Sequence, residues 1–216
     1  MVPDILVAAV CLGAAYLLGG IPFALVVGRL FYGTDIREEG SGNLGATNTF
    51  RVLGAGAGLF VLILDAAKGA VAVSLAWALL AVSGAERAVP LSWFLLLVTF
   101  AVMAGHVYSP YLRLKGGKGV AAAAGALLVT MPLAVLVLLV VFAAVVAVSR
   151  WVSLASVVAA ALFPFVAFAL YSRDPAAVAL TVIAAALVIW RHRTNISRII
   201  AGTETRIGEN GRLAKR

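Results

Sequence analysis

Long runs of apolar residues constrain this chain more than any other feature. A helix needs about 20 apolar residues to cross a bilayer, and the chain holds several runs near or above that length. Of its 216 residues, 63% are hydrophobic and 12% are charged, against roughly 25% charged in a soluble domain. One soluble core cannot hide so much apolar surface. The sequence therefore predicts an all-α integral membrane protein, with one domain over residues 1–216.

The apolar runs predict about seven membrane-spanning helices, some of them short or broken. They cover 5–30, 54–82, 93–112, 120–131, 133–148, 153–171 and 176–190. Gly19-Gly20-Ile21-Pro22 predicts a kink that neighbouring helices can tolerate. Residues 120–148 could form one long helix, but Met131-Pro132 favours two pieces, because the residue before a proline avoids helical geometry. The piece 120–131 is short for a full span, so a re-entrant helix is an alternative.

Basic residues predict the orientation of the chain. With seven crossings and the N-terminus outside, 14 Lys and Arg residues fall on the inner side, seven of them in the polar tail 191–216, and 2, Arg87 and Arg173, fall outside. Basic residues gather on the cytoplasmic side of membrane proteins. A single crossing over 120–148 would place the tail outside, so the bias again favours two pieces. We therefore expect an outside N-terminus and a cytoplasmic C-terminus.

Three polar segments then share the cytoplasmic side, and Gly40–Arg51 is the first. Its small residues let backbone N–H groups approach a ligand, an arrangement that favours anions. Arg51 adds a planar guanidinium suited to phosphate. Further hydrogen-bond donors are Ser41, Asn43, Thr47 and Asn48. A plain glycine-rich loop with turn-forming residues is the alternative.

Lys115-Gly-Gly-Lys-Gly119 is the second polar segment and opens a predicted helix of small residues. Glycines and lysines before a helix start suit a phosphate. The segment is not a nucleotide-binding P-loop, because Gly119 follows the lysine in place of Ser or Thr, and Leu112 replaces the first glycine. A basic loop that only fixes the topology is the alternative.

Arg191–Arg198 is the third polar segment. If the preceding helix continues through it, His192, Asn195 and Arg198 recur every third residue and share one face. A basic tail that binds anionic lipid is the alternative.

Ionisable residues also occur within the predicted spans. Asp65 and Lys68 lie three residues apart, and charges inside a membrane helix are functional candidates. We expect them to support the site from within the membrane, and a structural ion pair is the competing explanation. His106 by itself is better explained as a hydrogen-bonded histidine at a helix interface than as a ligand.

The residue inventory excludes several kinds of chemistry. The net charge is +8, but no segment offers the basic solvated face of a nucleic-acid-binding protein. The chain has two histidines and a single cysteine, Cys11, inside the first apolar run, so we predict neither a metal nor a cofactor. It also lacks the Gly-x-Ser-x-Gly elbow of a hydrolase serine.

Taken together and in this order, the three polar segments resemble the motifs of the bacterial acyl-phosphate:glycerol-3-phosphate acyltransferase family. The motifs are Gly40-Ser-Gly-Asn-Leu-Gly-Ala-Thr-Asn-Thr-Phe-Arg51, Lys115-Gly-Gly-Lys-Gly-Val-Ala121, and His192-Arg-Thr-Asn-Ile-Ser-Arg198 with Gly202 and Glu204. The resemblance covers essentially the whole chain. It implies a seven-helix, multi-pass enzyme of the bacterial cytoplasmic (inner) membrane, with the active site on the cytoplasmic face.

The resemblance implies that a fatty acyl group passes from acyl phosphate to glycerol 3-phosphate, giving lysophosphatidic acid and phosphate. This is the first step of bacterial phospholipid synthesis, and neither acyl-CoA nor acyl carrier protein serves directly. The partners implied are the two substrates and membrane lipid, with functional coupling to the enzyme that makes acyl phosphate. Nucleic acid is not expected as a partner.

Residue by residue, the resemblance implies both catalytic and phosphate-binding positions. The catalytic positions are Ser41, Arg51, Lys115, His192 and Asn195. The phosphate-binding positions are Gly42, Asn43, Thr47, Asn48, Lys118 and Ser153, with Ser156 as the alternative to Ser153. The base that takes the hydroxyl proton is either His192 or a substrate phosphate.

Two other classes of function stay open at this point. The His-x4-Asp signature of better-known glycerolipid acyltransferases is absent, since Tyr111 and Ser197 stand where its Asp would follow His106 and His192. A small anion or phosphate transporter could use the same glycines and basic residues, but it predicts internal repeats that the sequence does not show. A non-catalytic scaffold gives no reason for three polar motifs on one face.

Overall fold

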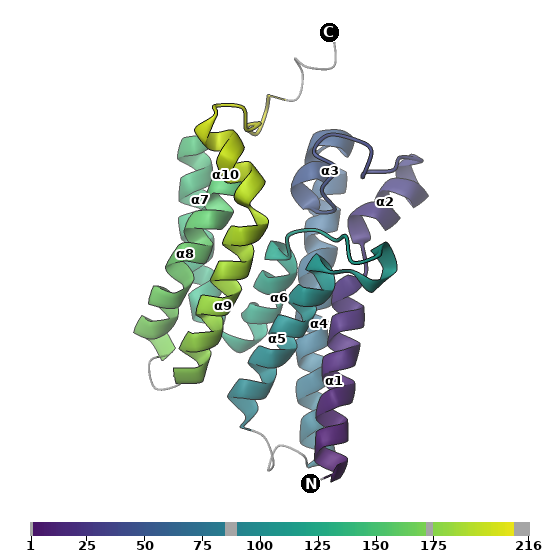
Figure 1. Cartoon of the computed structure of the whole chain (residues 1–216), viewed down its shortest axis with the longest axis vertical. Coiled ribbons are helices and arrows are strands. Elements are labelled where there is room, and N and C mark those ends of the chain that lie inside the picture. Colours follow the sequence, from purple (N-terminus) through teal and green to yellow (C-terminus); the bar gives the residue numbers. More distant parts are fainter. Residues whose placement is uncertain (1, 85–89, 172–174, 210–216) are drawn as a thin grey trace. The chain divides into compact units, whose positions relative to one another are not determined.

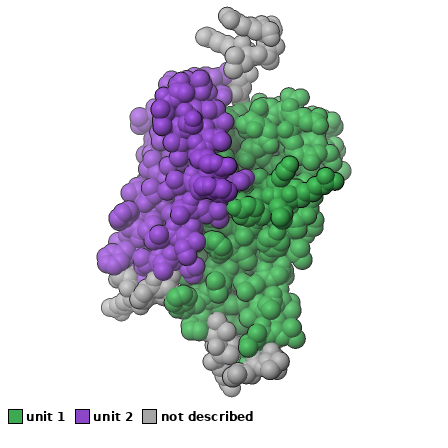
Figure 2. Space-filling view, in the orientation of Figure 1, with its two compact units in different colours: residues 1–132 green, residues 133–216 purple. Residues whose placement is uncertain are grey.

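The computed structural model describes residues 2–84, 90–171 and 175–209, and every regular element within those ranges is a helix. The predicted all-α class is therefore confirmed for the described ranges. The helices cluster into two compact units, which Figure 2 colours separately. The single domain over 1–216 stays a prediction. Unit 1 covers residues 1–132 and unit 2 covers residues 133–216.

Unit 1 is built on four helices that pack side by side, with short elements between them (Figure 1). Its elements are α1 (Val2–Gly20), α2 (Phe23–Tyr32), α3 (Ala46–Leu53), α4 (Ala55–Ser83), α5 (Leu91–Val107), the 3₁₀ helix η2 (Pro110–Leu112) and α6 (Val120–Thr130). α1 packs against α4 and α5, and α6 packs against the same two helices. Their shared core is apolar and includes Val73, Phe94 and Val98.

Glycines let the helices of unit 1 approach closely. A Cβ atom added at Gly69 would overlap the Ala122 carbonyl oxygen, and one added at Gly125 would overlap that of Ala66. Small residues at such crossings are how helices associate in lipid, where no hydrophobic force drives them together. The α4–α6 contact therefore depends on the absence of side chains at two positions.

The predicted kink in the first apolar run is confirmed as a break between α1 and α2, which are bent by 41°. Neighbouring side chains donate to the two carbonyls at the break. Ser109 Oγ donates to Gly20 O at 2.6 Å, and Lys68 Nζ donates to Ile21 O at 2.8 Å. A break in a membrane helix is tolerated when neighbours satisfy the backbone in this way.

Unit 2 contains α7 (Pro132–Ser149), α8 (Val152–Tyr171), α9 (Pro175–Arg191) and α10 (Arg193–Ile200). The first residue of α7, Pro132, is counted with unit 1. α8 packs against α9, and α10 contacts both. The predicted break near Met131 is confirmed, because α6 ends at Thr130 and α7 begins at Pro132. The predicted polar tail is folded at its start, since it contains α10.

Within the described ranges, four helices are long and apolar enough to cross a membrane, or five if the bent α1–α2 pair counts as one span. They are α4, α5 with η2, α7 and α8, while α6 and α9 contain shorter apolar helices. The seven crossings and the orientation of the termini stay predictions. Arg87 and Arg173, the two basic residues predicted outside, lie beyond the described ranges.

The α4–α6 crossing generates a stability prediction. Gly125→Ala should lower the thermal unfolding midpoint of the detergent-purified protein, because the methyl group meets the Ala66 backbone and such overpacking costs about 1–3 kcal/mol. Gly13→Ala in α1 is the matched control, since no atom lies within 4 Å of its added Cβ. A midpoint for Gly125→Ala equal to that of the control would contradict this packing.

Candidate active site

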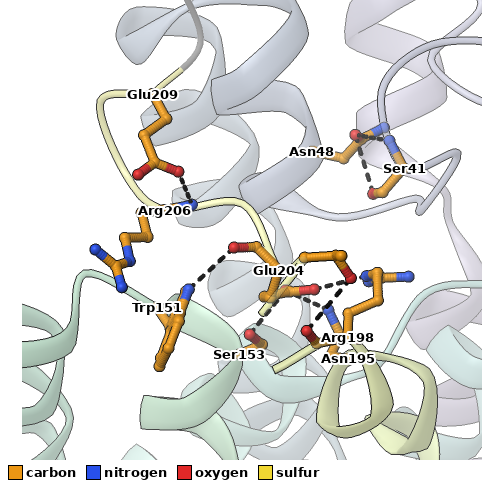
Figure 3. A network of polar contacts seen from close by, with 10 residues as sticks. Ser41, Asn48, Trp151, Ser153, Asn195, Arg198, Glu204, Arg206 and Glu209 are labelled. Carbon is orange, nitrogen blue, oxygen red and sulfur yellow. Dashed lines mark hydrogen bonds and ion pairs between the residues drawn. The ribbon is translucent and has the colours of Figure 1, made fainter. Parts of the chain in front are cut away.

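Asn48 organises the loop that carries the first motif. This buried side chain lies on α3, and its Oδ1 accepts hydrogen bonds from Ser41 N at 2.8 Å and Ser41 Oγ at 3.1 Å (Figure 3). Its Nδ2 donates to Ile36 O and to Glu39 O, both at 3.1 Å. The carboxamide thus holds three parts of the loop together. These bonds show that Asn48 positions Ser41. The contact of Asn48 with substrate phosphate stays a prediction.

The other first-motif residues surround that anchor. Ser41 is exposed, and Gly42 follows it with φ of 66°, a conformation that favours glycine. Asn43 is half-buried and lies beside Gly45, the residue before α3. Thr47 and Arg51 follow on α3 at i, i+4 spacing, so they share one helix face.

Asp35 engages two of the other basic residues near this loop. Arg37 and Arg29 donate to its Oδ2 at 2.6 Å and 2.7 Å. The hydrogen bond from Arg37 is the main cause that holds the pKa of Asp35 well below its usual range. Both arginines are exposed, so these ion pairs add little stability. The ion pairs do mean that Arg29 and Arg37 already contact a carboxylate of the protein.

The second motif lies against the end of α5. Gly116 N donates to Val107 O and Gly117 N donates to His106 O, each at 3.0 Å. A Cβ on Gly116 would overlap the His106 carbonyl oxygen, and one on Gly117 would overlap the His106 ring. The prediction that this loop opens a helix is confirmed, because α6 begins directly after Gly119. The two glycines also have a packing role that the sequence alone did not indicate.

The lysines of this motif differ in exposure, with Lys115 exposed and Lys118 half-buried. The first and second motifs meet beside them, because a Cβ on Gly117 would lie 2.5 Å from Leu44 O. A small pocket opens at this meeting point. Its lining comes from the α1–α2 break, the first motif, the end of α5 and the second motif, as Gly20, Ile21, Pro22, Leu44, His106, Ser109, Leu112, Gly116 and Gly117.

In unit 2, Glu204 accepts hydrogen bonds from two residues of the third motif and from Ser153 (Figure 3). Its Oε1 accepts from Ser153 Oγ at 2.8 Å and from Asn195 Nδ2 at 2.7 Å, and its Oε2 accepts from Arg198 Nε at 2.7 Å. Burial by itself would raise the pKa of Glu204, but the bonds from Arg198, Asn195 and Ser153 hold that pKa below its ordinary value. The carboxylate is therefore charged and fully engaged.

This cluster separates the two candidate serines. Ser153 joins the cluster, whereas Ser156 Oγ donates to Val152 O at 2.9 Å within its own helix. Glu204 itself was not among the predicted site residues, although it belongs to the third motif. Its signal in the sequence is its place six residues after Arg198, as one of two carboxylates in a basic tail.

His192 lies at the junction of two helices rather than inside one. α9 ends at Arg191 and α10 begins at Arg193, while His192 N donates to Val188 O and Ile196 N donates to His192 O across the junction. The shared face of His192, Asn195 and Arg198 stays a prediction. His192 is buried, with Nδ1 2.8 Å from Val188 O. This contact favours the tautomer with hydrogen on Nδ1, which leaves Nε2 as the hydrogen-bond acceptor.

The segment after α10 is tied to the α7–α8 junction. Ile207 N donates to Arg150 O at 2.9 Å. In return, the Arg150 guanidinium donates to Ile207 O. Trp151 Nε1 donates to Glu204 O at 3.0 Å. These contacts hold the backbone at Glu204 itself and three residues after it.

The Glu204 cluster generates a prediction about pH. Because the pKa of folded Glu204 lies below its ordinary value near 4.5, its stabilising effect is complete above that value and is lost as pH falls through the folded pKa. At pH 7, Glu204→Gln should therefore lower the unfolding midpoint by roughly 5 °C, because it loses the charge-assisted bond from Arg198 and one hydrogen bond to a charged group contributes about 1.5–3 kcal/mol. The difference from the unmodified protein should shrink below pH 4.

Glu209→Gln is the matched control for this measurement, because Glu209 is an exposed carboxylate of the same segment that accepts from Arg206 N. Thermal unfolding of both variants and of the unmodified protein at pH 7 and at about pH 3 checks the prediction. Equal midpoints for Glu204→Gln and the unmodified protein at pH 7 would count against the cluster.

Comparisons with known proteins agree with the motifs. The family model described as "Glycerol-3-phosphate acyltransferase" matches residues 9–202. The glycerol-3-phosphate acyltransferase of Trichlorobacter lovleyi is 47% identical over 196 residues, 90% of this chain and 95% of the relative. Glycerol-3-phosphate acyltransferase 2 of Moorella thermoacetica is 48% identical over 195 residues, 90% of this chain and 95% of that one.

Two solved structures also match. They are crystal structures of PlsY (YgiH), an integral membrane glycerol 3-phosphate acyltransferase. The glycerol 3-phosphate form has a TM-score of 0.83 and 35% identity, covering 93% of this chain and 96% of that one. The lysophosphatidic acid form has a TM-score of 0.81 and 34% identity, covering 93% and 95%. The chain therefore belongs to the glycerol-3-phosphate acyltransferase family.

Proposed function

We propose that this protein transfers a fatty acyl group from acyl phosphate to glycerol 3-phosphate, giving lysophosphatidic acid and phosphate. The observation that carries the proposal is family membership over residues 9–202, which includes all three polar motifs. The related PlsY structures are named for a glycerol 3-phosphate form and a lysophosphatidic acid form, which are the acceptor and product of this reaction. Family membership also argues against the transporter alternative.

Both proposed substrates carry phosphate, and unit 1 holds the cations that suit it. We infer that Arg51, Lys115 and Lys118 bind substrate phosphate, because they are the basic residues of the first two motifs and the family model covers both motifs. A guanidinium binds phosphate with two parallel hydrogen bonds, and a lysine binds it as a point charge. Ser41, held by Asn48, and Thr47 supply hydroxyl groups on the same motif.

Acyl phosphate is a mixed anhydride, so the acyl group arrives already activated. The glycerol hydroxyl attacks the acyl carbon, the new ester C–O bond forms, and the bond from the acyl carbon to the phosphate oxygen breaks. Positioning of the hydroxyl and stabilisation of developing charge can then supply most of the acceleration. The hydroxyl proton goes either to His192, whose favoured tautomer leaves Nε2 as an acceptor, or to a substrate phosphate.

The proposed setting is the bacterial cytoplasmic membrane, with the active site on the cytoplasmic face. Seven crossings are supported by the bent α1–α2 pair, the four long apolar helices and the shorter apolar helices in α6 and α9. The bias of basic residues supports an outside N-terminus. We further propose that residues 1–216 act as one catalytic domain, since the family model extends across both units. Functional coupling to the enzyme that makes acyl phosphate stays a prediction from the family resemblance.

The choice of acyl donor tests the proposed function. Purified protein mixed with palmitoyl phosphate and glycerol 3-phosphate should produce lysophosphatidic acid, whereas palmitoyl-CoA should not replace the phosphate donor. Donor without acceptor should leave no acylated protein, because the transfer is direct. Product formation is followed by mass spectrometry of the lipid extract, with intact-protein mass as the second readout. Robust turnover with palmitoyl-CoA, or a trapped acyl-serine at Ser41, would refute the proposal.

Arg51 provides a second prediction. Arg51→Ala should lower kcat/KM for glycerol 3-phosphate about ten- to a hundredfold, because a charge-assisted hydrogen bond contributes roughly 1.5–3 kcal/mol. Arg51→Lys should recover only part of the loss, since it lacks the planar fork. Arg37→Ala is the control, because Arg37 is held by Asp35. If folded Arg51→Ala retains the unmodified kinetics, the assignment of Arg51 is wrong.

A further inference from the structure

We propose that His106 is a positioning residue of this enzyme, and that Asp65 and Lys68 hold it against the loop Lys115–Gly119. The inference rests on the proposed function, because its consequence is the placement of the phosphate-binding lysines. His106, Asp65 and Lys68 belong to none of the three polar motifs. All of the contacts involved lie within unit 1.

The chain of contacts begins with Lys68 at the α1–α2 break. Its ammonium lies 2.7 Å from Asp65 Oδ1 and donates to Ile21 O at 2.8 Å, and it also faces the Phe23 ring, 5.5 Å from the centroid. The side chains of Lys68 and Asp65 are only 1% and 2% exposed. Buried charges are costly unless paired and hydrogen-bonded, so these contacts fix both groups in space.

Asp65 extends the chain from α4 to α5. The same Oδ1 that faces Lys68 lies 3.7 Å from His106 Nδ1. His106 is buried, with 7% of the residue exposed. Its ring is therefore placed between a fixed carboxylate on one side and the second-motif loop on the other.

The far edge of the His106 ring supports the loop. Its Nε2 lies where a Cβ of Gly117 would be, and its backbone oxygen accepts from Gly117 N at 3.0 Å. Gly117 in turn passes close to Leu44 of the first motif and directly precedes Lys118. The ring thus supports the point where the two phosphate-binding motifs meet. A change in the ring shifts Gly117, and with it the start of the Lys118 side chain.

The alternative explanation is that Asp65 and Lys68 form a purely structural ion pair, and it predicts a different result for their replacement. If Asp65 and Lys68 only join α1 to α4, a neutral pair of similar size can replace them without effect on catalysis. If they hold His106 for the loop, the neutral pair stays folded but binds glycerol 3-phosphate less well. The KM for glycerol 3-phosphate separates these alternatives, because it depends on where the lysines are placed.

The first test replaces His106. His106→Leu should raise the KM for glycerol 3-phosphate roughly tenfold or more while kcat changes less, since small misplacements of binding groups have effects of that order. His106→Gln should recover much of the loss, because its amide can fill the space beneath Gly117. Thr99→Val is the control, since Thr99 is a buried polar residue of the same helix whose hydroxyl donates to Leu95 O. It should leave KM, kcat and the unfolding midpoint close to those of the unmodified protein.

The second test removes the ion pair. Asp65→Asn combined with Lys68→Gln avoids leaving one buried charge without its partner and keeps an N–H donor at position 68, where Lys68 donates to Ile21 O. It should reproduce the KM defect of His106→Leu. Adding His106→Leu to this double variant should raise KM little further, because groups that act through one chain are not additive. The unfolding midpoint of each variant is measured alongside, so that loss of fold is recognised.

Several results would overturn the inference. They are an unchanged KM in folded His106→Leu, an equal KM defect in Thr99→Val, no KM defect in the double variant, or defects that multiply in the triple variant. If the variants of His106 do not fold, an unchanged KM in the folded double variant decides against the chain, and a raised KM decides for it. Absence of turnover in the unmodified protein would instead refute the proposed function, and this inference with it.

Discussion

The break between α1 and α2 is the constraint on which much of unit 1 depends. Backbone carbonyls left without donors in an apolar environment cost several kcal/mol, roughly as much as any single contact in the fold contributes. Lys68 and Ser109 supply donors to Ile21 and Gly20. A buried lysine then requires a carboxylate, which Asp65 provides at 2.7 Å. A charged pair in the middle of a membrane helix is thus a consequence of interrupting the helix before it.

Each unit uses one buried polar side chain to hold its motif. Asn48 accepts from Ser41 and donates to two loop carbonyls. Glu204 accepts from Ser153, Asn195 and Arg198. Buried polar networks stabilise and order a structure only when every member is satisfied. In both cases the predicted functional residues are held by a neighbour, so their geometry is set before any substrate arrives.

The sequence predicted what depends on local pattern. The apolar runs located the long helices, and Pro22 and Pro132 located the two breaks, because length and proline geometry act within a few residues. Glu204 and the packing of Gly117 on His106 were not predicted. Ser153 and Glu204 are 51 residues apart, so only the tertiary fold shows that they meet. The one-residue interruption at His192, between α9 and α10, was likewise not predicted.

The backbone bonds of the second motif decide which of its groups can neutralise phosphate. If Gly116 N and Gly117 N turned toward a substrate, they would abandon Val107 O and His106 O, both carbonyls of buried residues. That exchange gives little net free energy, because each new hydrogen bond replaces one already made. The side chains of Lys115 and Lys118 can bind phosphate without that loss. We therefore infer that the glycines of this motif set the path of the loop and that its lysines supply the charge.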